Sequence, residues 1–62
     1  MQVTLNGSSH TVPEGCTVSA LAPNQRGVAV AVNQQIVPRS QWPTAQLRDG
    51  DRIEILEAAP GG

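Results

Sequence analysis

The chain has 62 residues, enough for one domain, with a formal net charge of −1 and four scattered basic residues, all of them arginines. This pattern predicts no surface for nucleic acid or an anionic membrane. One cysteine and one histidine exclude an internal disulfide and are too few ligands for a structural zinc site. Because so short a chain cannot easily enclose a drug-sized cavity, we expect a carrier or binding module with no bound metal or cofactor, and not an enzyme.

Alternating apolar and polar residues predict a first strand over residues 2–6. The pair Asn6-Gly7 is the strongest short-range signal for a tight hairpin turn, so a return strand is expected over residues 9–13, with Val12 facing inward. Pro13 cannot donate a hydrogen bond to a central ladder. The second strand is therefore expected at an edge of the sheet.

A short helix is predicted next, over residues 18–22. Thr17 precedes it and offers a hydroxyl to cap the first turn, and Pro23 pushes the residue before it out of the helical region. Cys16 and His10 have no partner residues for chemistry in the sequence, and both are interpreted as structural.

The next two strands are predicted over residues 28–32 and 36–38, separated by a polar turn. In the first of them the valines share one face, whereas Ala29 and Ala31 share the other. Residues 39–47 follow one proline breaker, Pro38, and contain a second, Pro43. They are interpreted as irregular or a single-turn connection, with Trp42 and Leu47 pointing inward. A turn at Asp49-Gly50-Asp51 follows, with Gly50 in a positive backbone angle.

The last strand is predicted over residues 52–57, with Ile53 and Ile55 toward the core. Leu56 then points to the opposite face, beside Ala29 and Ala31. An outward leucine next to two small residues forms an apolar patch on the open side of the sheet, and we interpret it as a candidate partner interface.

The order strand, strand, helix, strand, strand, strand predicts an α+β domain over residues 1–57, in which a mixed five-stranded sheet wraps one short helix. Residues 58–62 carry no bulky side chain and are expected to form a flexible C-terminal tail.

The tail Ala59-Pro60-Gly61-Gly62 is where the sequence departs from what folding requires, because glycine is costly to order and adds nothing to a core. A thin backbone can thread into a narrow site of another enzyme. An α-carboxyl group, with a usual pKa of about 3.3 to 3.7, is ionised at neutral pH and can attack the α-phosphorus of ATP. The other interpretation is that the two glycines are simply a frayed chain end.

Several segments resemble the ThiS family, the ubiquitin-like β-grasp sulfur carriers of thiazole formation in thiamin biosynthesis. The resemblance covers the whole chain and is most specific in the second half. The matching segments there are Val28-Ala29-Val30-Ala31-Val32-Asn33, Ile36-Val37-Pro38-Arg39 with Trp42, Leu47, Asp49-Gly50-Asp51, Ile53-Glu54-Ile55-Leu56 and Gly61-Gly62.

The resemblance implies that an E1-like, ThiF-like enzyme uses ATP to adenylate Gly62, with Ala59, Pro60 and Gly61 threaded into its site. It further implies that a persulfide donor supplies sulfur and that the resulting thiocarboxylate serves a ThiG-like thiazole synthase. The N-terminus lacks the pattern of a signal peptide and no apolar run is long enough to span a membrane, so a cytoplasmic protein is expected.

Three alternatives remain open from the residues. One is a sibling carrier for molybdopterin or amino-acid synthesis, and another is a ubiquitin-like modifier of other proteins. The chain has no lysine, which excludes lysine-linked chains of the protein itself but not attachment to targets. The third is a β-grasp interaction domain with an inert terminus.

Overall fold

A computed structural model describes residues 1–22 and 27–57 of the chain. Within these ranges the chain forms five strands, one turn of α-helix and one 3-10 turn. In chain order they are β1 (Gln2–Leu5), β2 (Ser8–Thr11), α1 (Val18–Leu21), β3 (Val28–Val32), β4 (Gln35–Val37), η1 (Arg39–Gln41) and β5 (Arg52–Glu57).

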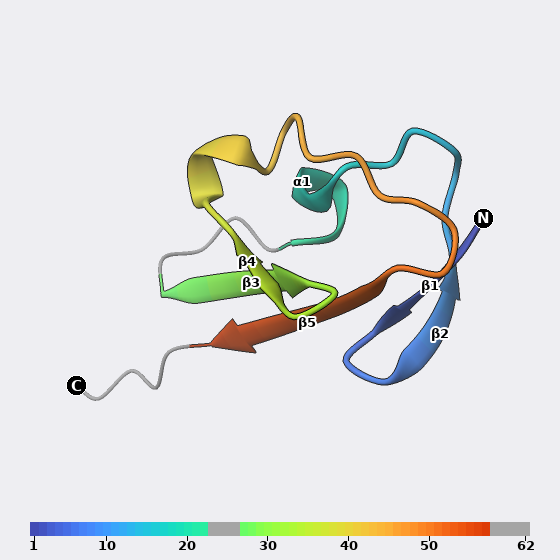
Figure 1. Cartoon of the computed structure of the whole chain (residues 1–62), viewed down its shortest axis with the longest axis horizontal. Helices are drawn as coiled ribbons and strands as arrows, with labels where there is room; N and C mark the ends of the chain where they lie inside the picture. Colours follow the sequence, from blue (N-terminus) through green and yellow to red (C-terminus); the bar gives the residue numbers. More distant parts are fainter. Residues whose placement is uncertain (23–26, 58–62) are drawn as a thin grey trace.

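The five strands form one mixed sheet in the order β2-β1-β5-β3-β4. β5 lies in the centre, parallel to β1 and antiparallel to β3, although it comes last in the described chain. Figure 1 shows α1 on one side of the sheet, covered further by the connection that runs from η1 to β5. The predicted fold, a five-stranded mixed sheet with one short helix, is confirmed, and β2 lies at an edge as expected.

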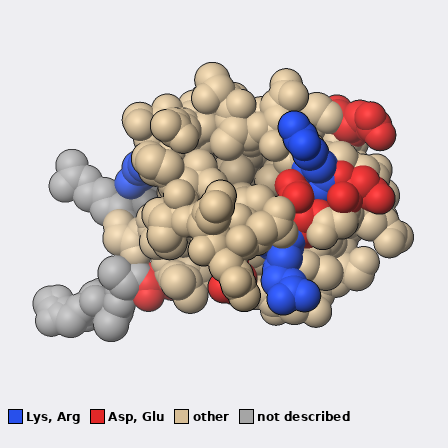
Figure 2. All heavy atoms as spheres, in the orientation of Figure 1, with Lys and Arg blue, Asp and Glu red and all other residues tan. Residues whose placement is uncertain are grey.

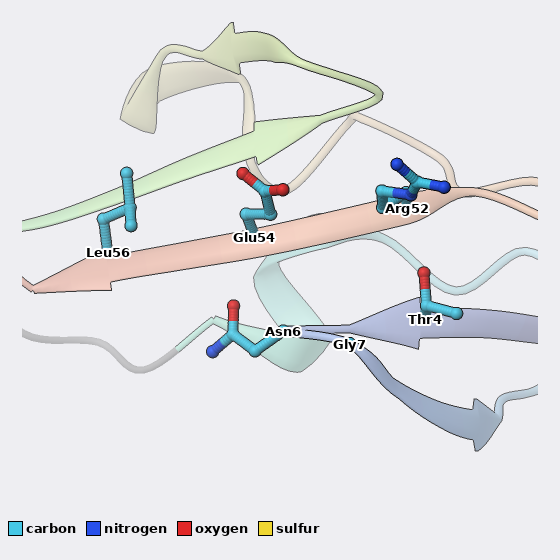
Figure 3. Close-up of a pocket in the computed structure, with 6 residues that line it drawn as sticks. All are labelled: Thr4, Asn6, Gly7, Arg52, Glu54 and Leu56. Atoms are coloured by element: carbon cyan, nitrogen blue, oxygen red, sulfur yellow. The ribbon is translucent and has the colours of Figure 1, made fainter.

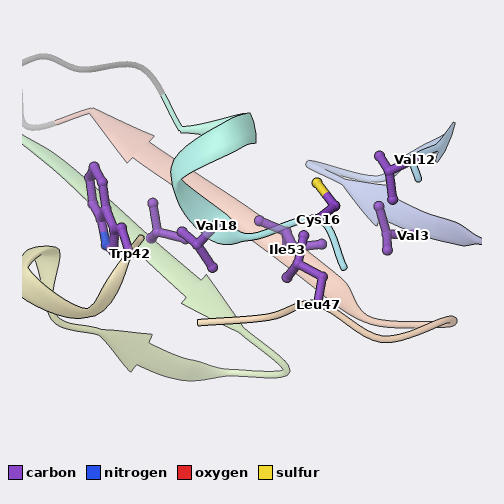
Figure 4. Packing of buried hydrophobic residues seen from close by; sticks show 8 residues of the cluster. Val3, Val12, Cys16, Val18, Trp42, Leu47 and Ile53 are labelled. Atoms are coloured by element: carbon purple, nitrogen blue, oxygen red, sulfur yellow. The ribbon is translucent and has the colours of Figure 1, made fainter. Parts of the chain in front are cut away.

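The core lies between α1 and the sheet. It is formed by buried apolar side chains from both halves of the chain, and Trp42 closes one end of it while Val3 and Val12 lie at the other (Figure 4). Its members are Val3, Val12, Cys16, Val18, Val30, Trp42, Leu47 and Ile53. Trp42 donates its indole N–H to the Val37 carbonyl at 2.9 Å, so its polar atom is satisfied inside the core. The inward positions predicted for Trp42 and Leu47 are confirmed.

α1 is held by the rest of the chain and not by its own cap. Thr17 occupies the cap position but its hydroxyl makes no capping hydrogen bond, so that prediction is wrong. The amides of Val18 and Ser19 donate instead to the carbonyls of Ala45 and Trp42, at 2.9 and 3.1 Å. A helix of a single turn is not stable by itself in water, and the η1–β5 connection supplies the missing acceptors.

Element boundaries differ from the predictions by one or two residues. β1 ends at Leu5 because Asn6 already adopts a positive φ of 50° as part of the hairpin turn. β2 covers Ser8–Thr11, so Pro13 lies beyond the strand. β4 likewise ends at Val37, before the proline that follows.

The turn before β5 is built by side chains that accept backbone hydrogen bonds. Asp49 accepts from the amide of Gln2 at 2.8 Å, and Asp51 accepts from the amide of Arg48 at 2.8 Å. Gly50 has a φ of +88°, as predicted. The two aspartates therefore organise the turn that the sequence predicts at this point.

β5 has the predicted bounds, but its two inward isoleucines are unequal. Ile53 is 1% exposed, whereas Ile55 is only partly buried where it packs against the core. Both isoleucines face the core as predicted, but Ile55 is less buried than Ile53.

We predict that Ile53→Ala lowers the free energy of unfolding by about 2 to 5 kcal/mol, because it leaves a cavity among fully buried neighbours. The matched variant Ile55→Ala should cost less than about 2 kcal/mol, since the removed atoms are partly in contact with water. Urea denaturation of both variants checks this order, and an equal or reversed loss would contradict the burial of β5.

Candidate functional site

The sheet has one covered face and one open face. Along β5 the residues Arg52, Glu54 and Leu56 alternate with the inward isoleucines, and all three are exposed on the side away from α1. The pairing register places Ala29 opposite Leu56 and Ala31 opposite Glu54 on the same face. The predicted outward position of Leu56 is confirmed.

Four apolar residues form what we call the outer-face patch: Ala29, Ala31, Ile36 and Leu56. Ile36 and Leu56 are the large exposed apolar side chains of the described chain, 64% and 56% exposed. Ala31 is only 6% exposed, so its methyl group forms the floor between neighbouring side chains and offers little surface to a partner. Its place in a partner interface stays a prediction.

Ile36 is the residue that sequence reasoning missed. Its cross-strand partner is Ala31, which puts it on the outer face. Within the sequence, Ile36 lies in a short apolar run next to Val37, and either residue could have faced the core. The signal that could have found it is the alternation of side chains along a strand: Val37 packs against the core, so its neighbour Ile36 points to the opposite face.

Beside the patch, the open face is hollowed between β1 and β5. The hollow has a volume of about 510 Å³ and is lined by side chains that Figure 3 shows along the two strands and at the turn after β1. Its lining residues are Thr4, Asn6, Gly7, Arg52, Glu54 and Leu56. Leu56 belongs to both the hollow and the patch. Along β5 the acidic Glu54 lies between the basic Arg52 and the apolar Leu56 (Figure 3), and such a mixed surface suits a protein partner better than a small apolar ligand.

Charge elsewhere is sparse. On the face drawn in Figure 2, arginines and acidic residues are interspersed and the middle is uncharged, so no basic patch is present there. Within residues 1–22 and 27–57, no group of three or more histidine, cysteine or acidic residues is close enough to hold a metal ion. The helices of these ranges are too short to cross a membrane.

The two residues interpreted as structural lie in different environments. Cys16 is a free, buried thiol in the core, and its sulfur contacts the Thr17 carbonyl at 3.6 Å. His10 is exposed on the edge strand β2, opposite Val3.

The residues predicted to carry the chemistry, Ala59, Pro60, Gly61 and Gly62, lie outside the described part of the chain. What the structure does place is the strand that leads to them. β5 ends at Glu57, where it is still paired with Val28 of β3. The segment that follows therefore starts from a central strand next to the outer-face patch.

A scan against protein families matches residues 3–62 to the ThiS family. The chain belongs to the ThiS family. It is a sulfur carrier of thiamin biosynthesis, a small carrier and not a catalyst, and the resemblance found in the sequence is thereby confirmed.

Three relatives place the chain within this family. It is 39% identical over 66 aligned residues to the sulfur carrier protein ThiS of Escherichia coli (strain K12), with both chains covered completely. It is similar in structure to a thiamine biosynthesis protein (ThiS) from Geobacter metallireducens, with a TM-score of 0.83, 29% identity and complete coverage of both chains.

The third relative is a thiazole synthase of Paramagnetospirillum magneticum, 35% identical over 66 aligned residues. The match covers this whole chain but only 20% of that protein. A stretch similar to the ThiS-family domain is thus part of a longer polypeptide whose name is that of a synthase.

We predict that Leu56→Asp changes the free energy of unfolding by less than about 1 kcal/mol, because the leucine side chain is more exposed than buried. Ser19→Asp, which adds the same charge on the exposed side of α1, is the matched control. Thermal and urea unfolding of both variants measure this, and loss of the fold in Leu56→Asp alone would show that the patch belongs to the core.

Proposed function

We propose that this ThiS-family chain carries sulfur as a thiocarboxylate on Gly62. The observation that carries the proposal is the placement of β5: the strand is fixed in the centre of the sheet and ends at Glu57, five residues before Gly62. Five extended residues reach at most about 17 Å. A carboxylate at the end of so short a segment can enter a partner's site only when the partner docks close to the end of β5.

The chemistry proceeds in balanced steps. An oxygen of the Gly62 carboxylate attacks the α-phosphorus of ATP, and pyrophosphate leaves. The terminal sulfur of a persulfide then attacks the carbonyl carbon of the acyl-adenylate and AMP leaves, giving an acyl persulfide. A thiol cleaves its sulfur–sulfur bond, so that the thiol is oxidised to a disulfide and the carrier keeps the reduced thiocarboxylate.

The partners follow from this sequence of steps. ATP is used by an E1-like, ThiF-like adenylating enzyme, so the carrier itself needs no bound cofactor. The acceptor of the sulfur is a ThiG-like thiazole synthase, and the thiazole synthase relative that contains a stretch similar to this chain supports that pairing. Covalent joining gives two partners a high effective concentration, which is useful when they must meet in each turnover.

The outer-face patch is the proposed docking surface for the adenylating enzyme. Ile36 and Leu56 present exposed apolar side chains next to the strand that leads to Gly62. Docking there brings the partner against the same side of the sheet from which Leu56, the second-last residue of β5, projects.

The cytoplasm, where thiols stay reduced, is the proposed compartment, and the free thiol of Cys16 suits it.

We predict that the protein gains the mass of one oxygen-to-sulfur exchange on Gly62 when it is incubated with ATP, a ThiF-like enzyme, a persulfide donor and a reducing thiol. Intact-mass spectrometry, followed by fragmentation of the C-terminal peptide, measures this. One extra residue after Gly62 should abolish the exchange, because it moves the carboxylate by about 3.5 Å from the position where it meets the α-phosphate.

Cys16→Ser is the control for a sulfur held on the thiol instead of the carbonyl. The exchange should persist in this variant, since the buried thiol takes no part in the steps above. Sulfur found on Cys16, or thiolation of the extended chain, would overturn the carrier mechanism.

We predict that Leu56→Asp weakens binding to the ThiF-like enzyme by at least about tenfold, because docking would bury a carboxylate against an apolar surface. Ser19→Asp should bind as the unmodified chain does. Isothermal titration calorimetry compares the three proteins, and equal affinities would show that the patch is not the docking surface.

A further inference from the structure

Asn6 makes two hydrogen bonds to the last strand from the end of β1. Its amide donates to the carbonyl of Ile53 at 2.9 Å, and its side-chain oxygen Oδ1 accepts from the amide of Ile55 at 2.8 Å. Asn6 is also the first central residue of the hairpin turn, with a φ of 50° followed by a φ of 85° at Gly7. One residue therefore turns the chain and contacts β5 (Figure 3).

The second of these bonds takes the place of a missing ladder bond. The backbone pairing of β1 with β5 covers Thr4 with Arg52 and Leu5 with Ile53, and then β1 turns away into the hairpin. The amide of Ile55 would next bond to a carbonyl of a continuing β1. The Asn6 side chain supplies that acceptor. On the β1 side, hydrogen bonding to β5 therefore continues for two residues beyond Ile53, as far as Ile55.

β5 is held differently on its two sides. Toward β3 the pairing continues to its last residue, Glu57, which lies opposite Val28. Toward β1 the described contacts reach Ile55 through Asn6, and the hollow opens next to them. After Ile55, the described pairing of β5 is with β3 alone. The direction of the last residues of β5 thus depends on this pairing and on the hydrogen bond from the Asn6 side chain.

We infer that Asn6 is a positioning residue for the Gly62 carboxylate, acting through Ile55. The inference rests on the proposed function. Only five residues separate Glu57 from Gly62, so a displacement of the end of β5 also moves the carboxylate relative to the α-phosphate. A displacement of about 1 Å can lower the reaction rate by a large factor. The bond from Asn6 limits that drift without any contact with the tail's own residues.

Two substitutions separate the side-chain bond from the turn. Asn6→Gly keeps a residue that favours positive φ but deletes the oxygen acceptor, whereas Asn6→Asp keeps both the turn preference and an acceptor for the Ile55 amide. The pair is therefore matched for hairpin formation and differs in the bond to β5.

The first readout is amide hydrogen exchange, which does not depend on any partner. In Asn6→Gly the Ile55 amide should exchange about tenfold faster, while the amide of Val30 in the core stays protected; Asn6→Asp should resemble the unmodified chain. Unchanged exchange at Ile55 in Asn6→Gly would overturn the inference.

The second readout is the rate at which a ThiF-like enzyme releases pyrophosphate from ATP as the carrier concentration is varied, at a temperature where circular dichroism shows every variant folded. Asn6→Gly should lower kcat about tenfold with KM for the carrier unchanged, because docking through the outer-face patch is retained. Asn6→Asp should restore kcat. A loss of stability alone would leave kcat unchanged in a fully folded carrier, and that result would overturn the inference.

A third variant removes the hydrogen-bond donor, the N–H of Ile55, and keeps the acceptor on Asn6. The chain is short enough for chemical synthesis, so an ester can replace the amide between Glu54 and Ile55, deleting the Ile55 N–H while Asn6 remains. It should show the same fall in kcat as Asn6→Gly, and an unchanged kcat would overturn the inference even if Asn6→Gly failed to fold. Absence of pyrophosphate release from the unmodified carrier would instead contradict the proposed function.

Discussion

The structure depends on the insertion of its last strand into the middle of the sheet. β5 joins the β1–β2 hairpin to the β3–β4 pair, and without it the two halves share no strand pairing. Ile53, which is 1% exposed, contributes to both the ladder with β1 and that with β3. Pairs between β1 and β5 join residues such as Thr4 and Arg52, which are far apart in the sequence, so the fold closes only after the last strand is in place.

The same placement links stability to function. A tail attached to an edge strand would lie at the margin of the domain, where strands fray most readily. A tail that follows a central strand starts instead from the best-supported backbone of the molecule, and the open face beside it is free for a partner because the core uses only the other face. In a domain this small, one sheet thus provides both one wall of the core and the proposed docking surface.

The helix α1, which covers one face of the sheet, is held by backbone hydrogen bonds to the η1–β5 connection. α1 is a single turn, and its first amides bond to carbonyls of that connection. Trp42 anchors the connection by packing in the core and bonding to Val37, while Arg39 lies over its ring with Cζ at 5.4 Å from the centroid. A cation above the ring face is attracted by its negative charge density, which supports the tryptophan's position.

The sequence by itself determined the fold class, the strand order along the chain, the bounds of β5 and the outward position of Leu56. These depend on local rules: a period of two fixes which side chains share a face, and a pair such as Asn6-Gly7 between two alternating segments favours a hairpin turn. The terminal glycines likewise marked the candidate site, although that part of the chain lies outside the described residues.

Only the tertiary structure decided which residues supply the hydrogen-bond acceptors that α1 and β5 lack locally. The cap of α1 comes from Ala45 and Trp42 and not from Thr17, and the Ile55 amide is satisfied by Asn6. Burial was decided at the same level, since the inward Ile55 is only partly buried whereas Ala31, on the outer face, is 6% exposed. These are contacts between distant residues, and a periodic pattern records which face a side chain occupies but not what lies above it.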